Sequence, residues 1–534
     1  MNSSRASIST EAARSDLGDV SGRDRLVRNV LTSWLTQMVF VVAGFVMPRL
    51  IDHRLGQEVL GLWDLGWTLI AYFSLVQLGV VGSVNRYVAM HYARNDISGL
   101  NRCASSVFWV LLVMAAIIGL LSVGTAVALP RLMPERVGEH GADMTWVVLG
   151  LGGASAIQTA SSVYAGVLTG CHRWGIHNGA HAAGYTLTVL GMVAVLLGGG
   201  GIRGLALVQF LGELLPTATR VFFAYRVCPG LRLSLRQADW KTARAMMQFG
   251  GKSFVPQVAE LILHQTVNVL IVGYLGPAAL ALFARPHSLV MQSRIFVLKM
   301  SAVLVPSVSS LQALGEQGRI QELVVKSARY TAFLILPVTT FLVVCGGPLL
   351  GLWMGPRYAD DWVVAVLALG YTGVTLQLPV LGILGGMNQH GRLAIANLVG
   401  SLVAAVGAVV VLGGLKLGLL AVAVAVAGPL LAVNVFYAPV HICHRTGLPI
   451  GRYLKEALLF PLLCILPFAV CLLAARWLFG KQPVLALLGG GAVGGAVLLP
   501  IYWRSVLPES LKASVPWLSA RRKKPTAAAA GWVA

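Results

Sequence analysis

Charged side chains are scarce in this chain. Only 11% of its 534 residues are Asp, Glu, Lys or Arg, whereas soluble domains carry about 25%. Acidic residues are the rarest, with 20 Asp and Glu against 41 Lys and Arg. This composition excludes an ordinary soluble enzyme or binding domain. It indicates an integral membrane protein, because 57% of the residues are hydrophobic.

Catalytic and metal-binding motifs are also missing. No HExxH, GxSxG or Asp-x-Asp sequence occurs, and the 7 cysteines form no CxxC pair and no Cys/His spacing typical of a metal site. Gly251-Lys252-Ser253 resembles the end of a phosphate-binding loop, but Met246 occupies the position of its first glycine. We therefore expect no enzyme activity, no metal and no bound cofactor, and we interpret the cysteines as packing residues.

Long hydrophobic runs dominate the sequence. About 14 of them reach the ~20 residues that a helix needs to cross a ~30 Å hydrocarbon core. They are continuous, which favours helices over the alternating strands of a membrane barrel. The predicted fold class is an all-α integral membrane protein with about 14 transmembrane helices. The expected spans lie near 30–51, 60–84, 104–129, 144–170, 178–198, 202–225, 253–275, 286–311, 327–352, 362–386, 393–413, 418–441, 456–478 and 483–503.

The net charge of +21 follows the positive-inside rule and does not indicate nucleic acid binding. Most Lys and Arg fall on the two tails and on the even-numbered connections, so both termini are expected in the cytoplasm. The most basic connection, residues 226–252, is interleaved with Trp240 and Phe249 and is typical of an amphipathic helix at the inner headgroup region.

Two halves of the chain share a sequence pattern. Leu55-Gly56 and the Leu60 to Trp63 stretch match Leu275-Gly276 and the Leu280 to Phe283 stretch 220 residues later. Gly166 and Gly170 match Gly382 and Gly386, and such GxxxG pairs allow close helix approach. Each half has six spans, so the repeat is parallel, an arrangement associated with a site between two lobes. The expected organisation is a disordered cytoplasmic tail (1–27), a first six-helix lobe (28–225), the basic linker (226–252), a second six-helix lobe (253–445), a helical hairpin (446–504) and a basic tail (505–534).

The sequence also resembles a known group of transporters. The resemblance lies in the opening RLVRNVLTSWLTQMVFVVAGFVMPRLI with LGQEVLGLWDLGW, in LGVVGSVNRYVAMHYARND, and in the linker ADWKTARAMMQFGGKSFVPQ, and it covers most of residues 26–445. These stretches resemble the bacterial polysaccharide transporters, the Wzx-type lipid-linked oligosaccharide flippases of the multidrug/oligosaccharidyl-lipid/polysaccharide superfamily. The resemblance implies a two-lobe bundle with a cationic cavity in the bacterial cytoplasmic (inner) membrane. It also implies transbilayer movement of an undecaprenyl-pyrophosphate-linked oligosaccharide by alternating access, with membrane lipids and other polysaccharide assembly proteins as partners.

Basic residues inside the expected spans are the candidates for binding the pyrophosphate. Arg294 and Lys299 lie in the eighth span, Arg49 near the outer end of the first, and Arg220 near the inner end of the sixth. A charge near the bilayer centre costs about 2.5–3.5 kcal/mol, so these groups are expected to face a hydrated cavity or a partner. The alternatives are an ion pair between spans 7 and 8, snorkelling of Arg49 to the interface, and neutralisation of Glu213 by Arg220.

Intramembrane acids are the candidates for coupling to an ion gradient. Ser253, Gln257, Glu260, His264 and Asn268 lie on one helical face of the seventh span. Glu260, His264, Glu213 and Asp64 could bind H⁺ or Na⁺ with an affinity that differs between transport states. Charge balance for buried bases, or a hydrogen-bonded packing histidine at position 264, is the alternative interpretation.

Other functions are less consistent with these features. A cation-coupled multidrug exporter predicts an acidic or aromatic cavity, and a lipid II flippase of the same superfamily would carry a different headgroup. A polysaccharide ligase or polymerase usually needs a large outer loop, whereas the longest expected outer loop is residues 130–143. A membrane scaffold has no need for buried charge. The sequence therefore favours a flippase for surface polysaccharide export.

Overall fold

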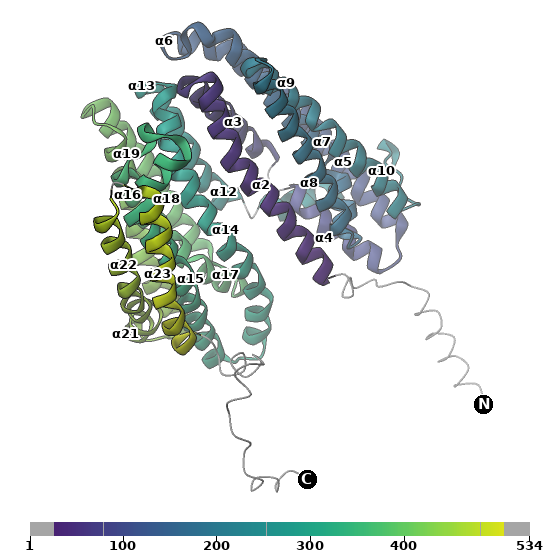
Figure 1. Ribbon diagram of the computed structural model, residues 1–534. Helices are drawn as coiled ribbons and strands as arrows, with labels where there is room; N and C mark the ends of the chain where they lie inside the picture. Colours follow the sequence, from purple (N-terminus) through teal and green to yellow (C-terminus); the bar gives the residue numbers. More distant parts are fainter. Residues whose placement is uncertain (1–25, 78–79, 252–253, 481, 507–534) are drawn as a thin grey trace, which may run out of the picture. The chain divides into compact units, whose positions relative to one another are not determined.

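The structure, a computed structural model, describes residues 26–77, 80–251, 254–480 and 482–506. Every regular element within these ranges is helical (Figure 1). Twelve helices in the described ranges are long and apolar enough to cross a membrane. The predicted all-α fold class is therefore confirmed, and the chain is a multi-pass membrane protein.

Helices of the first half follow the expected spans but contain interruptions. The second expected span is divided, because α3 ends at Phe73 and α4 begins at Val80. The basic linker begins with the last two residues of α10, and its final part forms α11. The elements are α2 (Leu26–Leu55), α3 (Gln57–Phe73), η2 (Ser74–Gln77), α4 (Val80–Ala93), α5 (Ile97–Leu132), α6 (Pro134–Val137), η3 (Gly138–His140), α7 (Gly141–Gly170), α8 (Trp174–Leu197), α9 (Gly201–Gly212), α10 (Leu214–Val227), η4 (Leu235–Gln237) and α11 (Trp240–Gly251).

Helices of the second half include four one-turn π-helices, η5, η7, η8 and η9. The helix of the eighth span begins at Pro277, earlier than the expected residue 286, because proline at the first helical position favours a helix start. The elements are α12 (Phe254–Leu261), η5 (Ile262–Thr266), α13 (Val267–Leu275), α14 (Pro277–Ala313), α15 (Gln317–Met354), η6 (Pro356–Tyr358), α16 (Asp361–Leu376), α17 (Leu378–Gly386), α18 (Gly391–Val409), η7 (Val410–Gly414), α19 (Leu419–Leu431), η8 (Ala432–Tyr437), α20 (Ala438–Thr446), α21 (Ile450–Tyr453), η9 (Leu454–Leu459), α22 (Phe460–Leu478) and α23 (Pro483–Ser505).

Two further helices coincide with expected spans without being among these twelve. They are α7, with 30 residues, and α14, with 37 residues. Both exceed the ~20 residues that a membrane crossing requires, but α7 is rich in Gly, Ser and Thr and α14 carries several basic residues. The total of fourteen transmembrane helices therefore stays a prediction.

The described chain divides into two compact units. The first comprises residues up to Gln292 together with Trp353–Tyr358 and Gly391–Val433, and the second comprises Ser293–Leu352, Ala359–His390 and the residues from Asn434 on. The first unit therefore includes helices from both halves of the sequence. The lobe boundaries expected from the sequence, 28–225 and 253–445, stay a prediction.

Glycines allow close packing within each unit. In the first unit, a Cβ added at Gly166 would lie 2.4 Å from a methyl of Val84, and one at Gly170 would lie 2.6 Å from a methyl of Val88. The predicted close approach at the first GxxxG pair is therefore present, between α7 and α4. In the second unit, α22 and α23 pack along each other (Figure 1), with Gly490 against Ala475.

Backbone conformation supports the internal repeat. Residues with positive φ recur in the same order in both halves, at separations of 216 to 220 residues. The similarity is closest at Gly56 and Gly276, whose φ values are 91° and 90° and whose ψ values are 166° and 171°. The other pairs are Asn95 and Gly315, Gly138 and Gly355, His172 and Asn388, and Gly199 and Lys416.

Candidate functional site

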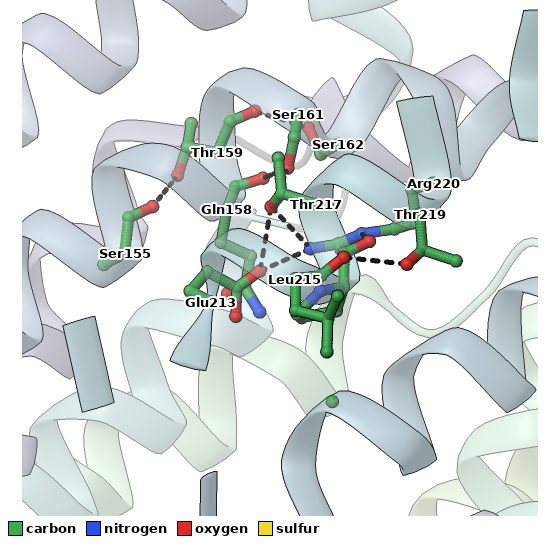
Figure 2. Close-up of polar contacts among 12 residues, drawn as sticks. Ser155, Gln158, Thr159, Ser161, Ser162, Glu213, Leu215, Thr217, Thr219 and Arg220 are labelled. Carbon is green, nitrogen blue, oxygen red and sulfur yellow. Dashed lines mark hydrogen bonds and ion pairs between the residues drawn. The ribbon is translucent and has the colours of Figure 1, made fainter. Parts of the chain in front are cut away.

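The sixth expected span contains a buried ion pair. Glu213 lies in the break between α9 and α10, where Pro216 has no N–H for the carbonyl of Gly212. Arg220, which is 3% exposed, contacts the Glu213 carboxylate through Nη2 (Figure 2). The guanidinium also donates to Thr217 Oγ1 at 3.1 Å and to the Pro216 carbonyl at 3.1 Å. Of the alternatives left open by the sequence, the structure shows that Arg220 neutralises Glu213.

Polar side chains of α7 extend this cluster. Ser161 Oγ lies 3.3 Å from Thr217 Oγ1, which joins α7 to α10 (Figure 2). Thr159 Oγ1 accepts a hydrogen bond of 2.9 Å from Gln77 Nε2 of η2. These contacts form two sets of polar side chains along α7, and such polar groups inside apolar helices mark substrate or ion pathways in membrane proteins.

Two histidines on α8, a helix that packs against α10, lie in the same unit. The rings of His177 and His181 stack at 6.3 Å, and Phe40 of α2 lies 5.1 Å from the His181 ring. His177 Nδ1 is buried and has no hydrogen-bond partner among the described residues. Sequence analysis did not select these histidines, although their spacing of four residues places them on one helical face.

A second buried ion pair joins α3 to α14. Arg285 Nη2 lies 2.6 and 2.5 Å from the two carboxylate oxygens of Asp64, and the two side chains are 6% and 16% exposed. Asp64 was expected as an ion-coupling candidate, and the structure gives it an arginine partner. Arg285 was missed because the eighth span was expected to begin after it.

A pair of histidines lies close to the π-helix η5. His264 Nδ1 is 3.1 Å from His287 Nε2 of α14, and the His287 ring stacks on Phe283 at 6.3 Å. On the neighbouring turns, Thr266 Oγ1 lies 2.8 Å from the Tyr72 hydroxyl of α3. His264 is therefore hydrogen-bonded to another titratable ring, which the sequence did not predict.

Arg49 lies at the end of α2 and lines a pocket of about 540 Å³. His53 and Arg357 line the same pocket, together with Asp52. Asp52 is 4% exposed and accepts hydrogen bonds from Arg357 Nη2 at 2.6 Å and from the Tyr358 hydroxyl at 2.7 Å. With its one acid engaged in this way, the pocket presents basic side chains suited to an anion.

The remaining candidates lie on α12 and α14. Arg294, in the second unit, is 7% exposed and lies 5.9 Å above the ring of Tyr371. Glu260 of α12 is an exposed residue of the first unit. The side chain of Lys299 and the whole of Ser253 lie outside what the structure describes.

The candidates thus form separate clusters. Arg220 and Glu213 pair with each other, Asp64 pairs with Arg285, His264 with His287, and Arg49 lines the pocket at the end of α2. No group of three or more His, Cys, Asp or Glu suited to a metal occurs among the described residues. The chemistry of these clusters is that of charged and hydrogen-bonding groups at depths where they are costly.

A model of the family described as "Polysaccharide biosynthesis protein" matches residues 93–364, about half of the chain. The chain belongs to the polysaccharide biosynthesis protein family. The matched segment contains the Glu213–Arg220 pair, the His264–His287 pair and Arg294.

A relative from Bacillus subtilis (strain 168) is similar over a longer stretch of the chain. It is described as "Uncharacterized membrane protein EpsK" and is 22% identical over 427 residues, which cover 77% of this chain and 81% of the relative. The similarity thus extends over most of both proteins, well beyond the segment that the family model matches.

Solved transporters share the fold. An inward-facing multidrug resistance MATE family transporter of the MOP superfamily has a TM-score of 0.65 at 15% identity, covering 79% of this chain and 96% of its own. The lipid II flippase MurJ, in an inward closed conformation, has a TM-score of 0.63 at 12% identity, covering 91% of this chain and 99% of its own. This member of the polysaccharide biosynthesis protein family therefore has a fold similar to that of MATE family transporters and MurJ.

Proposed function

We propose that this chain flips a polyprenyl-pyrophosphate-linked oligosaccharide from the cytoplasmic to the outer leaflet of the bacterial inner membrane. Movement occurs by alternating access and serves surface polysaccharide export. The chain acts as a transporter and breaks no covalent bond of its substrate. Its partners are the lipid-linked oligosaccharide, membrane lipids and other polysaccharide assembly proteins, and both termini lie in the cytoplasm.

The observation that carries this proposal is the presence of arginines within the membrane helices of a polysaccharide biosynthesis protein. Arg220 and Arg294 are at most 7% exposed, and Arg49 is an exposed residue in a basic pocket. A pyrophosphate crossing a low-dielectric layer needs such cations, and arginine binds phosphate oxygens bidentately. We assign headgroup contact to Arg49, Arg294 and Lys299, and positioning of the sixth helix to Arg220, whose charge is balanced by Glu213.

Coupling to H⁺ or Na⁺ is assigned to the seventh span. Asp64 and Glu213 each form an ion pair with an arginine, so they balance the positive charge of that arginine in the membrane. Glu260 and His264 lie one helical turn apart on α12 and η5, on the polar face of the span. We propose that protonation or ion binding at these two residues differs between the transport states.

The decisive experiment uses a deletion strain of the host bacterium. Lipid extracts are analysed for polyprenyl-pyrophosphate-linked oligosaccharide, and surface polysaccharide is measured in parallel. Accumulated lipid-linked repeat units and lost surface polymer are expected. Normal lipid pools with raised sensitivity to cationic drugs would instead identify an exporter, and accumulated lipid II would identify the cell-wall precursor as substrate.

Variants then test the assigned cations. Arg49→Ala and Arg294→Ala are expected to restore less surface polymer than the wild-type chain, because each removes a phosphate contact. Arg392→Ala is the control for Arg49→Ala, since this arginine is also exposed and does not line the pocket at the end of α2. Equal complementation by all three variants, at equal protein levels, would remove Arg49 and Arg294 from the headgroup site.

A further inference from the structure

The linker between α10 and α11 is fixed to the inner end of α5. Asn101 Nδ2 donates to the Gly230 carbonyl at 2.8 Å, and the N–H of Arg232 donates to Asn101 Oδ1 at 2.9 Å. One turn further along α5, Ser106 Oγ accepts a hydrogen bond of 2.8 Å from the N–H of Asp239. The linker is thus an ordered part of the first unit.

A cavity of about 770 Å³ lies between α5 and this linker. This volume falls within the range of about 300–1,000 Å³ that ligand pockets occupy. The lining is mostly apolar, with Val110, Val113 and Ile117 from α5, and Leu235, Trp240 and Met247 from the linker and α11. We call this cavity the linker groove.

The linker groove has the length of one membrane leaflet. Its lining on α5 extends from Ser106 to Ile117, and eleven residues of helix rise about 16 Å. The hydrocarbon core of a bilayer is ~30 Å thick, so the groove spans about half of it. Large apolar side chains at its rim remain exposed, with Val113 at 60%, Leu235 at 65% and Trp240 at 66%. An acyl chain of a single leaflet matches these dimensions.

The cytoplasmic end of the linker groove is basic. Arg102 precedes the lining residue Ser106 by one turn, Arg236 follows Leu235, and Lys241 and Arg244 lie on α11 beside Trp240 and Ala243, all four being exposed. Basic residues beside an apolar surface are typical of recognition of anionic lipid.

The one acid of the linker groove, Asp239, is already engaged. It caps α11 by accepting from the Thr242 hydroxyl at 2.7 Å and from the Thr242 N–H at 2.9 Å. These hydrogen bonds from Thr242 lower the pKa of Asp239 below its usual value.

We propose that the linker groove binds one anionic phospholipid of the cytoplasmic leaflet. An acyl chain lies along α5 between Trp240 and Ile117, and the phosphate lies among Arg102, Arg236, Lys241 and Arg244. This lipid contacts both α5 and the linker within the first unit, and it differs from the transported substrate. The inference therefore goes beyond the proposed function and does not depend on it.

The test uses the full chain in phosphatidylcholine vesicles that contain increasing amounts of dibrominated phosphatidylglycerol. Bromine on the acyl chain quenches nearby tryptophans, and the difference between the wild-type chain and Trp240→Phe isolates the signal of the linker groove. Saturable quenching at low mole fractions is expected with brominated phosphatidylglycerol. Equal quenching by brominated phosphatidylcholine would overturn the proposal.

Charge variants provide the second arm. Lys241→Gln/Arg244→Gln should weaken the apparent affinity for phosphatidylglycerol by about fivefold per charge. Arg392→Gln/Arg504→Gln removes the same charge from exposed positions on α18 and α23 and should leave this affinity unchanged. Equal affinities of the two double variants for phosphatidylglycerol would overturn the headgroup assignment. If Lys241→Gln/Arg244→Gln fails to fold, Arg236→Gln takes its place. Stronger competition by undecaprenyl phosphate than by unbrominated phosphatidylglycerol would overturn the assignment to a phospholipid.

Discussion

The sixth helix of the first half and its counterpart in the second half share a backbone pattern but differ in chemistry. Residues 212–215 (GELL) correspond to residues 428–431 (GPLL), 216 residues later. Both helices are interrupted near this point, the first between α9 and α10 and the second by the π-helix η8. The polar positions of the first helix are apolar in the second, where Pro429, Val433 and Phe436 replace Glu213, Thr217 and Arg220.

This difference separates what the repeat preserves from what function requires. Turns with positive φ recur in both halves, because they depend on backbone geometry alone. A buried charge, in contrast, needs a partner and is costly in every copy. The first half therefore carries the Glu213–Arg220 pair, while the equivalent Phe436 is 70% exposed and uncharged. The following substitutions test this contrast.

Loss of Arg220 should have the largest effect. Arg220→Ala leaves the Glu213 carboxylate buried without its partner, which typically costs about 3–5 kcal/mol. We expect a corresponding fall in the free energy of unfolding in detergent and a loss of surface polymer in cells. Phe436→Ala, at the equivalent exposed position, should change stability by about 0.5 kcal/mol or less. Equal losses of stability in Arg220→Ala and Phe436→Ala would refute the contrast. The double variant Glu213→Gln/Arg220→Gln, which removes both charges, should be more stable than Arg220→Ala.

Alanine at the paired glycines should have equal effects in the two halves. Gly56→Ala and Gly276→Ala place a Cβ at φ values of 91° and 90°, with no atom within 4 Å. The cost is therefore backbone strain, about 1–3 kcal/mol for each. Denaturant unfolding measures both, and Gly179→Ala in the open face of α8 is the control without strain. A large difference between the stability losses of Gly56→Ala and Gly276→Ala would show that the two halves do not share the same need for glycine at this turn.

Exchange of residues 217 and 433 should have a smaller effect. Thr217→Val removes the hydroxyl that accepts from Arg220 and should lower the free energy of unfolding by about 0.5–1.5 kcal/mol. Val433→Thr adds a hydroxyl that can bond to the carbonyl of Pro429 four residues earlier, so its effect should be smaller. Thermal unfolding in detergent compares the two. A larger loss with Val433→Thr would place a critical packing contact in the second half.

Glycine at the left-handed turn residues should give the smallest change, and it should be stabilising. His172 and Asn388 have φ values of 56° and 55°. His172→Gly should raise stability by up to about 1 kcal/mol, because glycine adopts this region without the Cβ penalty. Asn388→Gly should gain less, since asparagine tolerates the left-handed region. Thermal unfolding checks both, and His172→Ala, which keeps the Cβ, should give no gain.

Local pairs were within reach of sequence reasoning. Glu213 and Arg220 are seven residues apart, so two turns of helix bring them together, and neutralisation was one of the predicted alternatives. The four-residue spacing of His177 and His181 carried a similar signal, which was not used. Pairs that are distant in the sequence gave no such signal, because residues such as Asp64 and Arg285 are 221 positions apart. Their pairing depends on the rotation of α3 and α14 and on where α14 begins.

Composition and long apolar runs were sufficient for the membrane class and the helical fold, because lipid requires every spanning segment to satisfy its own backbone hydrogen bonds. Those constraints act residue by residue along the chain. The internal repeat was visible in the matching residue patterns of the two halves. The partner of Asp64 and the pocket that Arg49 lines were decided only when helices from both halves packed together in the first unit. Hydrogen bonds and ion pairs depend on distances of a few ångströms between side chains, and only the packed helices set those distances.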